Sequence, residues 1–147
     1  MRFWDSSGIV PLICRERSTS ALLRLDVDDT DVLVGAFTRT EVLSALCKHV
    51  RDGSLSRRSF ELSRAKLDAL QADWTENIDY EGVRARAERL LGIHALSAAD
   101  SLQLAAALLA VEEKTAGFEF VTLDERLAEA AAREGFLVKT GKIRGVT

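Results

Sequence analysis

The sequence contains few of the residues that cross-link small proteins or bind soft metals. Among its 147 residues are two cysteines, two histidines and one proline. Cys14 and Cys47 lie in apolar segments, which predicts reduced, packed thiols rather than a disulfide framework. His49 and His94 have no second histidine or cysteine pair at the spacing of a zinc site. Disulfide scaffolds and zinc modules are therefore set aside.

Long apolar stretches are also missing. No segment approaches the roughly 20 consecutive apolar residues of a membrane-spanning helix. The first residues, Met-Arg-Phe-Trp-Asp, lack the apolar core of a signal peptide. We therefore expect a cytoplasmic protein with no membrane contact. Hydrophobic residues make up 47% and charged residues 29% of the chain, which is typical of a globular protein, so residues 1–147 are expected to form one domain.

Positive charge is not in excess, since the formal net charge is −3. Nucleic-acid binding usually needs a basic face, so net charge alone does not favour it. The basic residues are nevertheless grouped, and such groups occur both on solvated helix faces and in phosphate-binding patches. The groups are Arg51, Arg57, Arg58, Arg64 and Lys66, then Arg84, Arg86 and Arg89, and finally Lys139, Lys142 and Arg144.

Apolar, strand-like runs alternate with helical patterns along the chain. This alternation predicts a mainly parallel sheet covered by helices on both faces. Pro11 is expected in the first turn of the first helix, and the Ala- and Leu-rich helix at 97–111 should be buried on most sides. Strands are predicted at 2–4, 31–36, 118–123 and 135–138, with a weaker candidate at 77–80. Helices are predicted from Ser6 onward and at 18–25, 38–50, 55–70, 81–91, 97–111 and 124–134.

Four acidic residues fall where predicted strands lead into helices. Asp5 ends the first strand, Glu41 lies in the first turn of the helix after the second, Asp100 lies in the first turn of the Ala-rich helix, and Asp124 follows the fourth strand. Ligands of open parallel sheets bind at this edge, beyond the carboxyl ends of the strands. The four acids are therefore candidates for one shared site.

Each acid also has a purely local explanation. Thr38 with Glu41, and Ser97 with Asp100, match the capping box, in which a hydroxyl and a carboxylate satisfy free backbone N–H groups at a helix start. Asp5 and Asp124 could be simple N-caps. For each acid taken alone, capping explains the pattern as well as a functional site does.

Together the acids are harder to explain by capping. Four carboxylates at one sheet edge would repel one another unless a cation neutralised them. Carboxylates without histidine or thiolate suit Mg²⁺ or Mn²⁺, and two such ions about 3.5–4 Å apart can promote hydrolysis of a phosphodiester. Ser6 and Thr122 flank the acids and could orient a ligand or water, or serve only as local hydrogen-bond donors.

The segments around the acids resemble the four acidic motifs of the PIN-domain family, in the usual order and with similar spacing, over nearly the whole chain. The likeness is greatest to the VapC-type toxins of toxin–antitoxin pairs. It implies a three-layer α/β/α sandwich and a Mg²⁺- or Mn²⁺-dependent endoribonuclease. The matching segments are FWDSS at 3–7, RTEV at 39–42, LSAADSLQLAAA at 96–107 and FVTLDER at 120–126.

The resemblance also implies roles for individual residues. Asp5, Glu41, Asp100 and Asp124 would be the catalytic, metal-coordinating acids, with Ser6 and Thr122 as supporting polar groups. Arg126 or the helix arginines could hold the RNA backbone.

Two kinds of protein partner follow from the resemblance as well. Family members of this type are usually homodimers that a small antitoxin inhibits by blocking the active site. The helices between Thr38 and Leu70 correspond to the region that grips the antitoxin. Their apolar residues could face that partner or pack in the core, and these are Phe60, Leu62, Leu67 and Leu70.

Other interpretations of the chain remain. A nuclease of the same fold could act in RNA maturation or on DNA flaps, and a catalytically silent module could use its helices to bind a partner. The run from Asp26 to Asp31 lacks the glycine and the final glutamate of a calcium loop, so we interpret it as a solvated loop. Cys47 and His49 point to different faces of a predicted helix and make a poor nucleophile and base.

Overall fold

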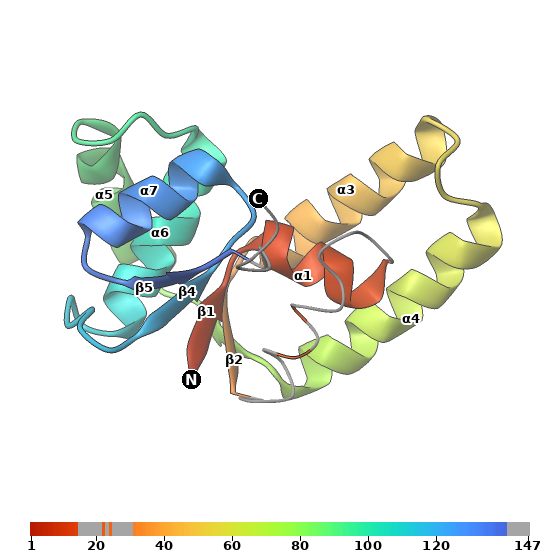
Figure 1. Ribbon diagram of the computed structural model, residues 1–147, viewed down its shortest axis with the longest axis horizontal. Coiled ribbons are helices and arrows are strands. Elements are labelled where there is room, and N and C mark those ends of the chain that lie inside the picture. Colours follow the sequence, from red (N-terminus) through yellow and green to blue (C-terminus); the bar gives the residue numbers. More distant parts are fainter. Residues whose placement is uncertain (15–21, 23, 25–30, 141–147) are drawn as a thin grey trace, which may run out of the picture.

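The computed structural model describes residues 1–14, 22, 24 and 31–140 of the chain (Figure 1). Strands and helices alternate along the chain, as the sequence predicts. The strands are β1 (Arg2–Trp4), β2 (Val32–Gly35), β3 (Thr75–Asn77), β4 (Glu119–Val121) and β5 (Leu137–Lys139). The helices are α1 (Ser6–Ile13), α3 (Thr38–Arg51), α4 (Arg57–Asp73), α5 (Tyr80–Leu91), α6 (Ala98–Ala110) and α7 (Glu125–Arg133).

The five strands form one sheet in the order β3-β2-β1-β4-β5, and every neighbouring pair is parallel. Strand β1 is central, with Phe3 paired to Leu33 of β2 and to Phe120 of β4. The backbone N–H of Asp5 donates to the carbonyl of Val121, so the pairing of β1 with β4 continues past the end of β1. The α/β fold with a parallel sheet is confirmed.

Alternate residues of the strands face opposite sides of the sheet. Phe3 and Phe120 point to one side, where their rings stack with centroids 5.2 Å apart, whereas Trp4 and Val121 point to the other. Helices α5, α6 and α7 cover the first side, and α1, α3 and α4 cover the second (Figure 1). This period of two places apolar side chains on both faces, and it produces the predicted three-layer sandwich.

Helix α6 has more buried residues than any other helix that the structure describes. Its side chains from Leu104 to Leu108 are all buried, as the sequence predicts. Small residues permit close packing here, since a Cβ placed on Gly35 of β2 would lie 3.4 Å from the Cβ of Ala106. Because Asp100 and Gln103 lie on this helix, the packing also determines where their side chains meet the sheet edge.

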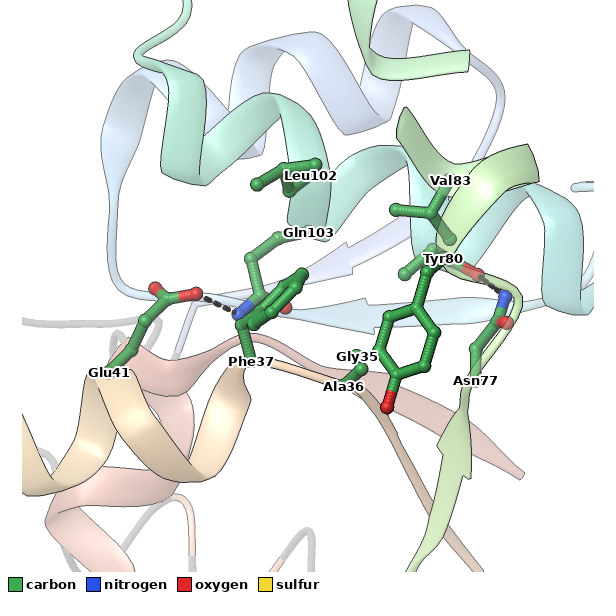
Figure 2. Close-up of a pocket in the computed structure, with 10 residues that line it drawn as sticks. Gly35, Ala36, Phe37, Glu41, Asn77, Tyr80, Val83, Leu102 and Gln103 are labelled. Atoms are coloured by element: carbon green, nitrogen blue, oxygen red, sulfur yellow. Dashed lines mark hydrogen bonds between the residues drawn. The ribbon is translucent and has the colours of Figure 1, made fainter. Parts of the chain in front are cut away.

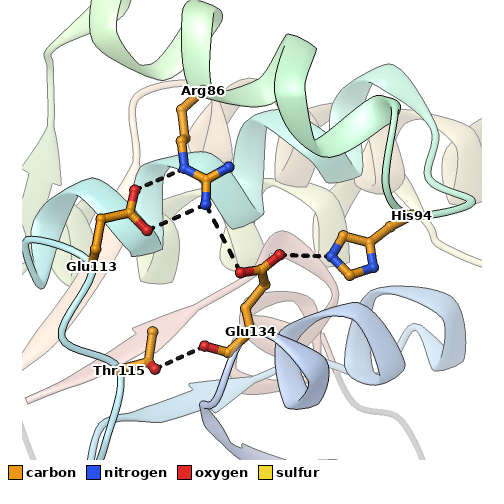
Figure 3. A network of polar contacts seen from close by, with 5 residues as sticks. All are labelled: Arg86, His94, Glu113, Thr115 and Glu134. Carbon is orange, nitrogen blue, oxygen red and sulfur yellow. Dashed lines mark hydrogen bonds and ion pairs between the residues drawn. The ribbon is translucent and has the colours of Figure 1, made fainter.

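A polar cluster joins three elements on the α5–α7 side (Figure 3). The guanidinium of Arg86 pairs with Glu113 at 2.7 Å and with Glu134 at 3.8 Å. Oε1 of Glu134 also lies 2.7 Å from Nε2 of His94, and His94 is buried. The backbone carbonyl of Glu134 accepts a hydrogen bond from the hydroxyl of Thr115. The cluster ties α5 to the chain segments that follow α6 and α7, which explains the burial of His94 without a metal.

Several local predictions differ from the structure. Pro11 is the sixth residue of α1 and so lies in its second turn rather than its first. Proline has no backbone N–H, so one hydrogen bond of a regular helix is missing there. The weak strand predicted at 77–80 lies earlier, at Thr75–Asn77, because Ile78 and Asp79 lead directly into α5.

Other predictions fall where the structure describes little or nothing. Of the helix predicted at 18–25, the structure describes only Leu22 and Arg24, and both are helical. Residues 26–30 of the predicted acidic loop lie outside the described residues, as do Lys142 and Arg144. Cys14 and Cys47 are partly buried thiols, as predicted. In the described part of the chain, no helix is both long and apolar enough to cross a membrane.

Candidate active site

The four predicted acids converge at the edge of the sheet where the strands end. Asp5 follows β1 and caps α1, and Glu41 lies in the first turn of α3. Asp100 lies in the first turn of α6, and Asp124 caps α7. Burial is the main cause that raises the pKa values of Glu41 and Asp100. The charges of Asp5 and Asp100 add to the rise at Glu41, and those of Asp124 and Asp5 add to it at Asp100. The acids therefore share one electrostatic site.

Asp5 is the most buried of the four, with 2% of its surface exposed. Its Oδ2 accepts hydrogen bonds from the Ser7 hydroxyl at 2.5 Å, from the Thr122 hydroxyl at 2.9 Å and from the Ser7 backbone N–H at 3.3 Å. Burial raises the pKa of this carboxyl, and the hydrogen bonds from Ser7 and Thr122 oppose that rise. Oδ2 thus accepts three hydrogen bonds, whereas Oδ1 accepts a longer one from the Ser6 hydroxyl, at 3.3 Å.

Glu41 is held by side chains from two other helices. Nε2 of Gln103 donates to its Oε1 at 2.9 Å, and the hydroxyl of Ser6 lies 3.0 Å from its Oε2. Because the Ser6 hydroxyl is also near Asp5, it bridges two of the acids. Burial is the largest cause of the raised pKa of Glu41, and the hydrogen bonds from Gln103 and Ser6 oppose it.

The predicted capping box of Thr38 and Glu41 is wrong. Helix α3 has Phe37 at its N-cap, with no side-chain cap. Thr38 is fully buried, and its hydroxyl lies 3.1–3.3 Å from the amide of Gln103. The tertiary contact with α6 thus replaces the local bond that the pattern predicts. Thr38 holds Gln103, and Gln103 holds Glu41.

Asp100 and Asp124 lie on the α5–α7 side of the sheet. The hydroxyl of Ser97 accepts from the N–H of Asp100 at 3.1 Å, so the predicted N-cap of this helix is confirmed. Asp124 caps α7 through its Oδ1, which accepts from the N–H of Leu127 at 2.8 Å. The hydroxyl of Thr122 accepts from the N–H of Asp124 at 3.1 Å while donating to Asp5. Capping and convergence therefore coexist, and neither excludes the other.

Sequence reasoning missed two residues of the site. Ser7 donates to Asp5 and accepts a hydrogen bond of 2.9 Å from the N–H of Leu123, so it ties α1 to the loop before α7. Gln103 is 2% exposed and makes the contacts to Glu41 and Thr38. A signal was present for Gln103, because an amide in an otherwise apolar helix must find a hydrogen-bond partner when buried.

The donor set fits a hard divalent cation. All four groups are carboxylates, and within the described residues no lysine or arginine forms an ion pair with any of them. Burial disfavours the charged forms of Asp5, Glu41 and Asp100, and repulsion adds to this at Glu41 and Asp100. A nearby Mg²⁺ or Mn²⁺ would reverse this preference. Across the described ranges, however, no three acidic, histidine or cysteine side chains already form a group that could hold a metal ion.

A shallow pocket with a cavity volume of about 10 Å³ opens beside Glu41 (Figure 2). Glu41 and Gln103 belong both to its wall and to the acidic cluster. Phe37 and Tyr80 stand at its mouth and are 46% and 57% exposed. The other lining residues are Gly35, Ala36, Asn77, Val83, Leu102 and Ala106. Arg126, which the sequence suggests as an RNA contact, is exposed in the first turn of α7, two residues after Asp124.

Comparisons with known proteins agree with this architecture. The family model described as "PIN domain" matches residues 2–133. A toxin–antitoxin complex from Klebsiella pneumoniae aligns with a TM-score of 0.66 and 17% identity, covering 97% of this chain and 98% of that chain. FitAcB from Neisseria gonorrhoeae aligns with a TM-score of 0.66 and 15% identity, covering 96% and 98%. No curated protein matches the sequence significantly. The match over residues 2–133 shows that the chain belongs to the PIN-domain family.

Proposed function

We propose that this protein is a divalent-metal-dependent endoribonuclease and the toxin of a toxin–antitoxin pair. The convergence of Asp5, Glu41, Asp100 and Asp124 at the strand ends of a PIN fold, with no basic partner among the residues that the structure describes, carries the proposal. Metal-assisted hydrolysis of a phosphodiester is the reaction that such a carboxylate set serves best.

The four acids would hold Mg²⁺ or Mn²⁺. In Asp5, Oδ1 accepts fewer hydrogen bonds than Oδ2 and would be the oxygen that binds the cation. In Asp124, Oδ1 caps the helix, so Oδ2 would bind the cation. The bound cation supplies activation of water and neutralisation of charge on the phosphodiester.

The remaining groups of the site position the acids. Gln103 and Ser6 orient Glu41, and Ser7 and Thr122 orient Asp5. Such hydrogen bonds from outside the ligand set restrict the rotamers of coordinating side chains. Arg126, which is exposed two residues after Asp124, would contact the RNA backbone.

Removal of divalent cations should abolish the activity. We expect total RNA to be cut in the presence of Mg²⁺ or Mn²⁺ and to stay intact with EDTA, because the acids alone repel a phosphodiester. Gel analysis of the products and mapping of the cut ends would measure this and name the substrate. Cleavage that persists in EDTA would contradict the metal requirement, and cutting of DNA alone would favour a different nuclease.

The antitoxin is proposed to bind between α3 and α4. The structural neighbour from Klebsiella pneumoniae is a toxin–antitoxin complex, and α3 and α4 project from the sheet in this chain (Figure 1). Leu67 is fully buried and belongs to the core, whereas Leu62 is 60% exposed. A pocket of about 260 Å³, here called the α3–α4 groove, is lined by Cys47, Val50, Arg51, Arg57, Phe60 and Glu61. We also propose that the toxin acts as a homodimer.

Val50→Gln should weaken antitoxin binding while RNA cleavage is kept. Val50 lines the α3–α4 groove, is 36% exposed and lies outside the acidic cluster. An interface residue of this kind contributes about 1 kcal/mol, so the affinity for an antitoxin encoded beside this gene should fall about 5-fold. Calorimetry measures the affinity, and growth on co-expression reports neutralisation. Leu137→Gln, an exposed leucine of β5, is the matched control, and an equal loss of affinity in both variants would contradict this site.

A further inference from the structure

We propose that the aromatic mouth of the pocket beside Glu41 binds one unpaired nucleobase of the RNA strand, next to the phosphodiester that is cut. This inference rests on the proposed ribonuclease function and adds a base-binding surface to it. Figure 2 shows Phe37 and Tyr80 on the same pocket as Glu41 and Gln103, so a base stacked on the rings would lie beside an RNA backbone bound at the acids.

The mouth of the pocket is built from two aromatic rings. Phe37 and Tyr80 have centroids 6.1 Å apart, and their planes are tilted by 51°. The rings contact each other, so a base would stack on their exposed surface rather than slide between them. Stacking on aromatic side chains is a general way for proteins to hold single-stranded nucleic acid.

Phe37 departs from the local rules of helix formation. It occupies the N-cap of α3, a position that favours Ser, Thr, Asp or Asn, and it provides no cap. Phe37 is also 46% exposed, so its side chain does not fill the hydrophobic core. A residue that neither caps its helix nor fills the core is best explained by a ligand outside the chain.

The two amides of the pocket are already in use. The amide of Gln103 bonds with Glu41 and Thr38. The amide of Asn77 donates to the carbonyl of Ala106 and accepts from the N–H of Asp79. The rest of the lining is apolar apart from the Glu41 carboxylate and the Tyr80 hydroxyl, and it includes no lysine or arginine among the described residues. These features suit a flat, uncharged base better than a phosphate, and they predict binding by stacking on the rings.

The experiment combines the double variant Phe37→Ala/Tyr80→Ala with RNA that lacks single bases. The substrate is a single-stranded oligonucleotide that contains the mapped cut site, with an abasic ribose at each position around the cut in turn. In the unmodified protein, one abasic position should raise KM about 10-fold, as loss of one stacked base does. In the double variant, KM should already be raised, and the same abasic position should add little, because the lost contact is shared.

Controls separate stacking from other causes. Phe37→Tyr and Tyr80→Phe keep the rings and should keep KM. Leu91→Ala removes an exposed side chain, 45% exposed, from the far end of α5 and should also leave KM unchanged. An unchanged KM in the double variant would overturn the inference. It would also be overturned if, at every abasic position, the rise in KM were as large in the double variant as in the unmodified protein. A double variant that only turns from dimer to monomer by light scattering would assign the pocket to a second copy of the chain.

Binding measured apart from cleavage distinguishes this inference from the proposed function. Fluorescence anisotropy of the labelled oligonucleotide is followed in an Asp100→Asn background, with and without the two ring substitutions. Binding that falls about 10-fold when the rings are removed supports the pocket even if no RNA is cut, in which case only the nuclease function fails. RNA that is cut but bound equally well with and without the rings overturns the pocket alone, and RNA that neither binds nor is cut overturns both.

Discussion

An Asp100→Asn variant should lose RNA cleavage by about 100-fold or more, since loss of residues that merely support metal ligands already costs about 10- to 100-fold. In the absence of divalent cations, the same variant should be more thermostable than the unmodified protein. Burial and the charges of Asp124 and Asp5 raise the pKa of Asp100, so its charged form is unfavourable in the folded state. Asparagine keeps the shape and removes that repulsion.

The pH dependence of stability follows from the same groups. Asp5, Glu41 and Asp100 all have raised pKa values in the folded protein, so the folded state binds these protons more tightly than the unfolded state. Their favourable contribution is complete below the ordinary values of 3.8 for Asp and 4.5 for Glu and is lost as pH rises through the raised values. At neutral pH, replacing Asp100 by asparagine is therefore expected to stabilise the metal-free protein.

Thermal unfolding in EDTA with and without added Mg²⁺ measures both effects. For Asp100→Asn without metal, we expect a rise in Tm of about 2–4 °C, the shift that about 1 kcal/mol produces in a domain of this size. Solvent screening limits the effect, because Asp100 is only partly buried. Mg²⁺ should raise the Tm of the unmodified protein more than that of the variant. Glu88→Gln, an exposed acid of α5, is the control, and a lower Tm for Asp100→Asn in EDTA would contradict the repulsion.

A Gln103→Met variant should lose activity about 10- to 100-fold, the usual cost of removing a group that orients a metal ligand. The substitution keeps an unbranched side chain in the core of α6 and removes the N–H donor to Oε1 of Glu41 and the partner of the Thr38 hydroxyl. Glu41 would then keep only the bond with Ser6. The Mg²⁺ concentration that gives half-maximal activity should rise.

The matched control for this variant is Ser101→Ala. Ser101 is 1% exposed on the same helix, and its hydroxyl bonds to the carbonyl of Ala98 rather than to any acid of the site. Both variants should lose some stability in urea unfolding, because each removes a buried hydrogen bond. Only Gln103→Met should change the Mg²⁺ titration. If the two titrations shift equally, Gln103 acts through packing and not by orienting Glu41.

Local patterns predicted the elements better than their contacts. The alternation along β1, with Phe3 on one face and Trp4 on the other, is visible in the sequence because side chains of a strand alternate by geometry. The helix starts at Ser97 and Asp124 were predicted correctly, since N-caps depend only on neighbouring residues. Thr38 misled the same reasoning because its partner, Gln103, is 65 residues away.

The sequence by itself determined the α/β layers and the acids that follow the strands, because strand ends and helix starts are encoded by short-range periodicity and capping. Only the tertiary structure decided that β1 lies between β2 and β4, and hence that Asp5 adjoins both Glu41 and Thr122. It also decided that Phe37 and Tyr80 meet at one pocket. These outcomes depend on strand order and helix packing, which join residues far apart in the chain and leave no local pattern.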